Sequence, residues 1–172
     1  MNFLNRNDAI NFLVEKELVQ LSKFQRKEIL EEWWSIDDKD EEFILLPKLL
    51  QNEILEFDEP VDDVMDSKYE PILEIALKYR YIGITNSYLE KKMGEILNQN
   101  IQVCGDVEIL YSCPCCKYRT IKERGQYEVC PVCHWEDDGN DDLTKYSSPN
   151  HMTLKEYKLK KDLTYKENDK YL

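Results

Sequence analysis

Two pairs of cysteines constrain this chain more than any other feature of its sequence. Cys113 and Cys116 are separated by two residues, as are Cys130 and Cys133, and 13 residues lie between the pairs. A Cys-x-x-Cys turn directs both of its sulfurs to the same side, so two such turns joined by a hairpin can present four sulfurs to one ion. The spacing therefore predicts a small zinc-ribbon-like β structure in which all four cysteines are metal ligands.

Other uses of paired cysteines fit this sequence less well. A thioredoxin-like redox pair leads into a helix beside a parallel sheet, whereas Pro114 and a hairpin pattern occur here. Disulfides need an oxidising compartment, and the N-terminus has no evident signal peptide. We expect a cytoplasmic protein without a membrane span, since no apolar run approaches about 20 residues. Zinc is favoured over iron, although "YEVCPVC" also resembles a rubredoxin knuckle and four thiolates accept either metal.

The remaining cysteines and both histidines have simpler interpretations. The two-residue spacing leaves Cys115 as a packed thiol beside the site, with a redox-sensing thiol as the alternative. Cys104 is most simply a small apolar residue of a strand. His134 directly follows the last cysteine, where ligation by both is strained, so we interpret it and His151 as surface or neighbouring side chains. A site closed by four thiolates has no open position for substrate, which predicts a structural role.

The pattern of apolar residues predicts helices before the cysteines and strands around them. Helical stripes are expected at Ile10, Leu13, Val14 and Leu18, and at Ile72, Leu73, Ile75, Ala76 and Tyr79. Capping residues mark helix starts, namely Asn7 or Asp8, Ser22 with Gln25, Pro47, Thr85, and Thr153 with Glu156. From about residue 100 the pattern changes to short strands, with a hairpin over residues 117–129. We predict an α+β protein, with a helical domain at 1–100 and a cysteine-rich zinc-ribbon domain with a C-terminal helix at 101–172.

The net charge of −12 is concentrated in one stretch of the chain. Residues 36–66, here called the acidic segment, contain 12 Asp and Glu against Lys39 and Lys48, a net −10. Such a stretch repels phosphates and attracts basic partners; a solvated loop that keeps the protein soluble is the alternative. The adjacent Trp33 and Trp34 point about 100° apart on a helix, so one can be core while the other is partly exposed and anchors a partner; ordinary packing of both is the alternative. The predicted partner-binding residues are Trp34, Asp37, Asp38, Asp40, Glu41, Glu42, Asp58, Glu59, Asp62 and Asp63.

No set of catalytic residues is evident, and we expect a non-enzymatic protein. The chain has two histidines and five glycines, with no phosphate-binding glycine loop. The stretch "HWEDDGNDD" does not fit the ligand spacing of a calcium loop. We interpret it as a turn whose side chains cap backbone groups, with an acidic recognition patch as the alternative, and we expect Trp135 to cover the metal site. The stretch "YRYIGITNSYLEKKM" is only superficially like a helix-turn-helix, and its acidic surroundings oppose DNA contact.

Four motifs occur in the order "CPCC", "GQYEVCPVC", "HWEDDG" and "SPNHMTLKEY". With them the chain resembles the bacterial cysteine-rich CPCC family over residues 111–157. Two positions depart from that family, Lys117 where glycine is common and His134 where Phe or Tyr is common, and neither removes a ligand. The resemblance implies a small zinc-ribbon-type domain without established enzymatic activity. Members are often encoded beside polymorphic toxins, which implies an immunity role for some of them.

Two functional hypotheses follow. The first is an immunity or antitoxin-type protein whose acidic surface binds and neutralises a basic toxin domain, for example a nuclease. The second is a zinc-ribbon module that acts in transcription or binds nucleic acid, for which Lys117, Arg119, Lys122 and Arg124 supply four cations within eight residues. Nine acids in residues 104–142 oppose those cations, so we rank the first hypothesis higher.

Overall fold

The computed structural model describes residues 2–161, 170 and 171, and its helices and small strand pairs confirm the predicted α+β class. The chain forms two compact units. Asn7–Tyr81 is called the helical unit here, and Met1–Arg6 together with Ile82–Leu172 is called the cysteine unit. The domain boundary predicted near residue 100 falls inside the cysteine unit. None of the helices described is long and apolar enough to span a bilayer.

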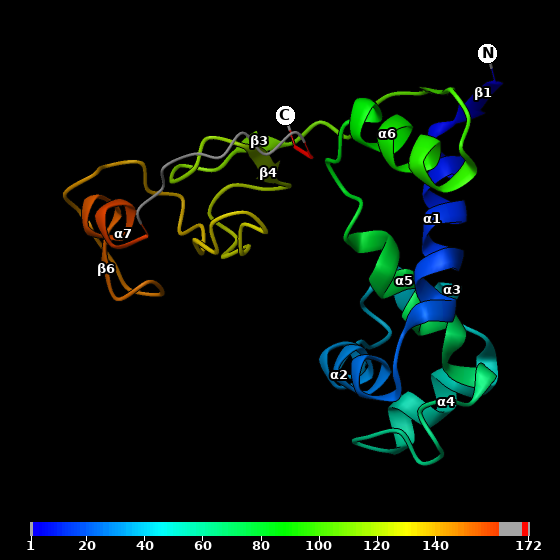
Figure 1. Ribbon diagram of the computed structural model, residues 1–172. Helices are drawn as coiled ribbons and strands as arrows, with labels where there is room; N and C mark the ends of the chain where they lie inside the picture. The colour runs from blue at the N-terminus through cyan, green and yellow to red at the C-terminus, as the bar shows by residue number, and fades with distance from the viewer. Residues whose placement is uncertain (1, 162–169, 172) are drawn as a thin grey trace. The chain divides into compact units, whose positions relative to one another are not determined.

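Short helices build the helical unit (Figure 1). They are α1 (Arg6–Gln20), α2 (Lys23–Trp33), α3 (Glu41–Leu45), α4 (Lys48–Glu56), the 3-10 turn η1 (Ser67–Tyr69) and α5 (Glu70–Tyr79). Ser22 and Gln25 form the predicted capping box at the start of α2. Pro47 was predicted to be the first residue of a helix. It is instead the residue before α4, which begins one position later, at Lys48. Helices α3 and α4 both lie in the acidic segment, which is therefore not a loop over its whole length.

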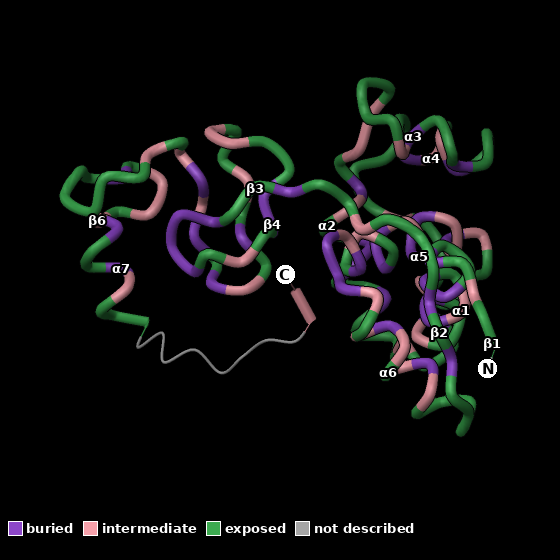
Figure 2. Tube along the Cα trace, turned by 90° about the horizontal axis from the view of Figure 1, so that it is seen from above, coloured by how far each residue is buried: buried purple, intermediate pink, exposed green. Residues whose placement is uncertain are grey.

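The core of the helical unit consists of the apolar stripes of its helices, drawn purple in Figure 2. As predicted, α1 buries Ile10, Leu13, Val14 and Leu18. Helix α5, which packs against α2, buries Ile72, Leu73, Ala76 and Leu77. Ile75 and Tyr79 are only half-buried. Burying one face of each helix in this way is what stabilises helices too short to be stable in isolation.

Trp34 is a core residue, which corrects its prediction as an exposed anchor. Its side chain is buried, and its ring meets Tyr69 edge to face at 5.7 Å. Its indole Nε1 donates a hydrogen bond of 2.9 Å to the carbonyl oxygen of Phe57. A buried indole needs such an acceptor, and here the acceptor lies 23 residues further along the chain. Trp33 is the half-buried member of the pair and packs on Tyr79.

The cysteine unit begins with a parallel strand pair that the sequence did not predict. Strand β1 (Asn2–Asn5) pairs with β2 (Ile101–Cys104), and helix α6 (Asn86–Leu97), capped by Thr85 as predicted, packs on β2. Helix α1 starts at Arg6, directly after β1 and before the caps expected at residues 7 and 8. The buried Arg6 guanidinium donates to Asn86 Oδ1 and to Glu108 Oε2, both at 2.9 Å. These partners lie 80 and 102 residues away, so a local pattern could not reveal them.

The rest of the cysteine unit consists of very short elements. Strands β3 (Tyr111–Ser112) and β4 (Arg119–Ile121) form one antiparallel pair, and β5 (Tyr146–Ser147) and β6 (Met152–Thr153) form another. Helix α7 (Leu154–Lys160) follows, with the predicted capping box of Thr153 and Glu156. The predicted hairpin over residues 117–129 is wrong. Instead, the segments on either side of each Cys-x-x-Cys turn pair with each other. Strands β3 and β4 pair across the first turn, and Val129 and Glu136 form a bridge across the second.

Candidate metal centre

Both Cys-x-x-Cys turns have the same backbone construction. In each, the N–H of the first cysteine donates to the carbonyl five residues later, and its own carbonyl accepts from the N–H four residues later. These bonds join Cys113 to Tyr118 (2.8 Å) and Lys117 (2.9 Å), and Cys130 to Trp135 (2.9 Å) and His134 (2.8 Å). Lys117 and His134 both lie in the left-handed region, with φ of 70° and 62°. The shared geometry directs the two sulfurs of each turn to one side.

The four sulfurs meet in the interior of the cysteine unit. The Sγ atoms of Cys113 and Cys133 lie 3.6 Å apart, as do those of Cys116 and Cys130. All four sulfurs lie within 4.8 Å of one another and all four residues are buried. A metal ion about 2.3 Å from each corner of a sulfur tetrahedron would hold the sulfurs about 3.8 Å apart. The four cysteines are therefore positioned to bind a metal ion, and within the described residues they are the one such cluster of three or more candidate ligands.

A family model described as Cysteine-rich CPCC matches residues 111–161 of the chain. This segment is similar to the CPCC family. The match runs from β3 to the end of α7, so it includes the whole cluster and the helix beside it. It confirms the resemblance inferred from the four motifs, and we call residues 111–161 the CPCC segment below. Comparisons with curated proteins and with solved structures gave no match.

Apolar and aromatic side chains enclose the sulfurs of the CPCC segment. The buried members are Ile121, Trp135, Leu154 and Tyr157, together with Cys115. The rings of Trp135 and Tyr157 meet edge to face at 5.0 Å, and the Tyr157 hydroxyl donates to the Cys133 carbonyl at 2.9 Å. Burial and the neighbouring cysteines raise the pKa of Tyr157 to about 12, so its hydroxyl keeps its proton and remains a donor. Trp135 covers the site, as predicted, and α7 holds Tyr157 beside it.

Thr120 contacts one ligand directly, and sequence reasoning did not single it out. Its buried hydroxyl lies 3.1 Å from the Cys130 Sγ, and β4 holds it there. A hydroxyl that donates to a thiolate offsets part of its charge in a site that water does not reach.

A Thr120→Val variant is therefore expected to bind its metal ion about 10-fold to 100-fold more weakly, because valine keeps the shape and loses the donor. Competition against a chromophoric chelator measures the affinity. Thr120→Ser keeps the hydroxyl and is expected to bind nearly as tightly as the parent. Equal affinities of all three proteins would show that the hydroxyl does not support the thiolate.

The other cysteines and histidines lie outside the ligand set. Cys115 is buried among the enclosing side chains, as expected for a packed thiol, and a redox role for it stays a prediction. Cys104 is exposed at the end of β2. His134 and His151 are exposed, both with positive φ, in turns of the chain. Their backbone positions account for them without any part in metal binding.

Asp137 is a buried carboxylate that sequence reasoning treated as one of several turn acids. Its Oδ2 accepts from Arg124 Nε at 2.8 Å and from the Gly125 N–H at 2.9 Å. Arg124 also donates to Asp141 at 2.8 Å, and hydrogen bonds to Asp141 and Asp137 raise the pKa of the guanidinium. Gly139, with φ of +77°, lies so close to Gly125 that a Cβ on it would be 3.1 Å from the Gly125 Cα. These contacts bear out the turn interpretation of "HWEDDGNDD".

The two partners of Arg124 offer a matched comparison, since both ion pairs measure 2.8 Å while Asp137 is fully buried and Asp141 is exposed. Asp137→Ala is expected to lower the free energy of unfolding by about 2–3 kcal/mol, because two charge-assisted bonds are lost in the interior. Asp141→Ala is expected to cost less than about 1 kcal/mol, because water screens an exposed pair. Urea unfolding of the metal-loaded protein measures both. Equal losses would contradict the difference.

The structure sorts the predicted partner-binding acids by what they already contact. Asp37 and Asp40 accept backbone N–H groups of their own turn. Three others hold side chains elsewhere in the unit, in the pairs Glu42 with Tyr79, Asp62 with Lys68, and Asp63 with Lys23. The remaining four, Asp38, Glu41, Asp58 and Glu59, are exposed and make no ion pair within the described part of the chain. Of the nine predicted acids, only these four are exposed and hold no other described residue.

The division into units also divides the charge. The helical unit has 20 Asp and Glu against nine Lys and Arg, a net −11. The cysteine unit has 15 against 14, a net −1. Nearly the whole negative charge of the protein thus belongs to the unit that does not contain the metal ligands.

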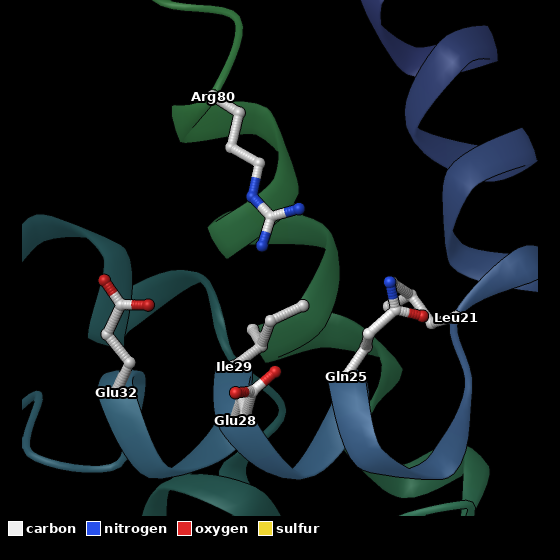
Figure 3. Close-up of a pocket in the computed structure, with 6 residues that line it drawn as sticks. All are labelled: Leu21, Gln25, Glu28, Ile29, Glu32 and Arg80. Atoms are coloured by element: carbon white, nitrogen blue, oxygen red, sulfur yellow. The ribbon is translucent and has the colours of Figure 1, made fainter. Parts of the chain in front are cut away.

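The helical unit has a pocket of about 340 Å³ beside α2 (Figure 3). It is lined by Leu21, Gln25, Glu28, Ile29, Glu32 and Arg80. Arg80, at the end of α5, points into it opposite Glu28 and Glu32. The lining thus carries one cation beside two carboxylates, and it includes no cysteine, histidine, serine or threonine.

Proposed function

We propose that this protein is a non-enzymatic, zinc-binding immunity or antitoxin-type protein of the cytoplasm that binds and neutralises a basic toxin domain. The helical unit would bind the toxin and the CPCC segment would hold the zinc ion. The observation that carries the proposal is the separation of charge, with a net −11 on the helical unit and −1 on the unit with the ligands. The association of CPCC-family members with toxin genes, implied by the resemblance, supports the same role.

Zinc is the proposed metal because four thiolates at tetrahedral spacing suit it, and iron is the less favoured alternative. Cys113, Cys116, Cys130 and Cys133 would hold the ion. When bound, it supplies folding free energy and no open coordination position, since all four positions are filled by protein. The enclosing side chains exclude water from the sulfurs, which suits a structural site.

The acidic surface would act on the toxin in two ways. A strongly negative surface speeds the encounter with a positively charged partner, most of all at low salt. If the toxin is a nuclease, the same carboxylates also compete with its nucleic-acid substrate for its basic site. Binding of this protein to nucleic acid itself is disfavoured by repulsion between carboxylates and phosphates.

The second hypothesis, a zinc ribbon that binds nucleic acid, loses part of its support. Of the four cations proposed for it, Arg124 is engaged by Asp137 and Asp141, and Arg119 Nε donates to the Leu110 carbonyl. Lys117 has a left-handed backbone conformation in the first Cys-x-x-Cys turn, and its N–H closes that turn by donating to the Cys113 carbonyl. The cysteine unit as a whole has 15 acids against 14 cations, so it offers phosphates no excess of positive charge.

Co-expression tests the proposed function. The product of the gene beside this one is expected to stop growth of a bacterial host when expressed alone, and this protein is expected to restore growth. A variant with Asp38, Glu41, Asp58 and Glu59 changed to their amides should restore growth less well, because four exposed carboxylates of the acidic segment are gone. Amides at Asp8, Glu15, Glu28 and Glu32, four exposed acids of the helical unit outside the acidic segment, serve as the control for the same loss of charge. A neighbouring product without toxicity, or toxicity that this protein leaves unchanged, would overturn the proposal.

A further inference from the structure

The acidic segment exposes an unusual number of large apolar side chains. Of the 19 such side chains in the described residues, seven lie in these 31 residues: Ile44, Leu45, Leu49, Leu55, Phe57, Val61 and Met65. Leu45 and Leu49 are 74% and 84% exposed. Single exposed apolar residues are ordinary on a protein surface, whereas a concentration of them within a charged region is typical of interaction sites.

The backbone that presents these side chains is held in place. The end of α4 is tied down by Trp34, whose indole donates to the Phe57 carbonyl. Glu53 binds Lys68 and the Tyr69 hydroxyl, and that hydroxyl in turn accepts the N–H of Asp62. Burial raises the pKa of Glu53, but these donors outweigh it and lower the pKa overall, so the carboxylate stays ionised and bound. A surface fixed in advance loses less conformational entropy on binding.

At the other end, α3 and α4 are joined as one surface element. Gln51 of α4 donates to the Leu46 carbonyl at 2.8 Å, across the turn at Pro47. On α3, Glu41 and Leu45 are four residues apart and share a helix face. An unpaired carboxylate therefore lies beside an exposed leucine there, and Asp58 and Glu59 directly follow the exposed Phe57 in the chain.

We propose that the acidic segment is a docking surface for a basic amphipathic segment of a partner protein, in which Ile44, Leu45 and Leu49 provide most of the affinity. Four exposed carboxylates of the segment, Asp38, Glu41, Asp58 and Glu59, would orient the partner and speed its association. This inference rests on the proposed function and adds the chemistry of the contact. Apolar anchors surrounded by charges that pair at the rim are the common division of labour in protein interfaces.

The charge of the segment argues for this occupant over two others. A second copy of the chain would bring another net −11 unit against the first, and like charges repel. A bilayer with anionic lipids would be repelled in the same way. A partner with an apolar row between lysines or arginines satisfies both the exposed leucines and the carboxylates.

Binding of a model peptide tests the docking surface on the full, zinc-loaded chain. The probe is a labelled peptide of about 18 leucines and lysines, ordered so that a helix has one apolar and one basic face. A peptide of the same composition with the order scrambled measures attraction by charge alone. The ordered peptide is expected to bind more tightly than the scrambled one. Leu45→Ser with Leu49→Ser should weaken the ordered peptide about tenfold or more, mainly through faster dissociation.

Matched variants separate the surface from general apolarity. Val19 is 85% exposed outside the segment and Leu159 is 73% exposed on α7, so Val19→Ser and Leu159→Ser remove similar exposed groups elsewhere. Both are expected to bind the ordered peptide as the parent does. Changing Asp38, Glu41, Asp58 and Glu59 to their amides should slow the association of the ordered peptide and make its association rate less dependent on salt.

Several results would overturn the inference: equal binding of both peptides, no loss in the Leu45 and Leu49 variant, an equal loss in the matched variants, or dimers of the chain that this variant abolishes. The fate of the proposed function is separable. If the neighbouring gene product is harmless while the ordered peptide still depends on Leu45 and Leu49, the function falls and the surface stands. If that variant still restores growth fully against a toxin, the surface falls and the function stands.

Discussion

A Cys130→Ser variant is expected to lose its tightly bound metal and the folded structure of the CPCC segment. The Cys130 Sγ is buried and lies 3.6 Å from the Cys116 Sγ, and it accepts a hydrogen bond from the Thr120 hydroxyl. A water molecule therefore cannot take the place of this sulfur as a ligand without disrupting the neighbouring side chains. Structural zinc contributes about 10–16 kcal/mol of apparent binding free energy in small domains, and losing one of four ligands removes much of it. Metal content after gel filtration and the fluorescence of the buried Trp135 measure the loss.

Two other cysteines control for the chemistry of the substitution. Cys104→Ser, at an exposed position on β2, is expected to keep one metal ion per chain. Cys115→Ser changes a buried thiol outside the ligand set and is expected to keep the metal as well. The helices of the helical unit should keep their circular-dichroism signal in every variant, because that unit contains none of the four sulfurs. Stoichiometric metal in the Cys130→Ser protein would contradict the ligand assignment.

The second large effect is expected in the helical unit, at Trp34. Trp34→Ala should lower the free energy of unfolding of this unit by about 3–5 kcal/mol, because a large buried ring is replaced by a cavity. It also leaves the Phe57 carbonyl without its indole donor, so the acidic segment loses one of its fixed points. Urea unfolding followed by circular dichroism at helical wavelengths measures the stability.

Its neighbour supplies the control. Trp33→Ala removes the same side chain from a half-buried position against Tyr79 and is expected to cost clearly less. Trp34→Phe keeps most of the packing against Tyr69 and removes only the donor, for which about 1 kcal/mol is expected. A larger loss from Trp33→Ala than from Trp34→Ala would show that the two rings contribute in the opposite order.

Features set by near neighbours in the chain were predictable. The capping boxes at Ser22 and Thr153 and the cap at Thr85 each depend on residues three positions apart, and all three form. The same holds for the two cysteine turns, whose geometry follows from four-residue motifs. The resemblance to the CPCC family was also visible from such motifs, and the family match covers the same stretch.

Features set by distant contacts were not predictable. The hairpin over residues 117–129 has the correct composition and a glycine near its centre, yet each of its strands pairs outward around its own cysteine turn. The strand at residues 2–5 has no alternating pattern of its own, and its partner lies almost a hundred residues away. Asp137 resembles the acids beside it in sequence, and only the approach of Arg124 distinguishes it.

By itself, the amino-acid sequence determined the four candidate ligands, the helical stripes and the place of the excess negative charge, because spacing, periodicity and charge are properties of the chain order. The tertiary structure alone decided which tryptophan is buried, which carboxylates are already engaged and which leucines stay exposed. Adjacent residues on a helix point about 100° apart, and only the packing of other elements determines which of them faces the core. The same packing left Glu41, Asp58 and Glu59 close in the chain to exposed apolar side chains, and the proposed docking surface depends on that arrangement.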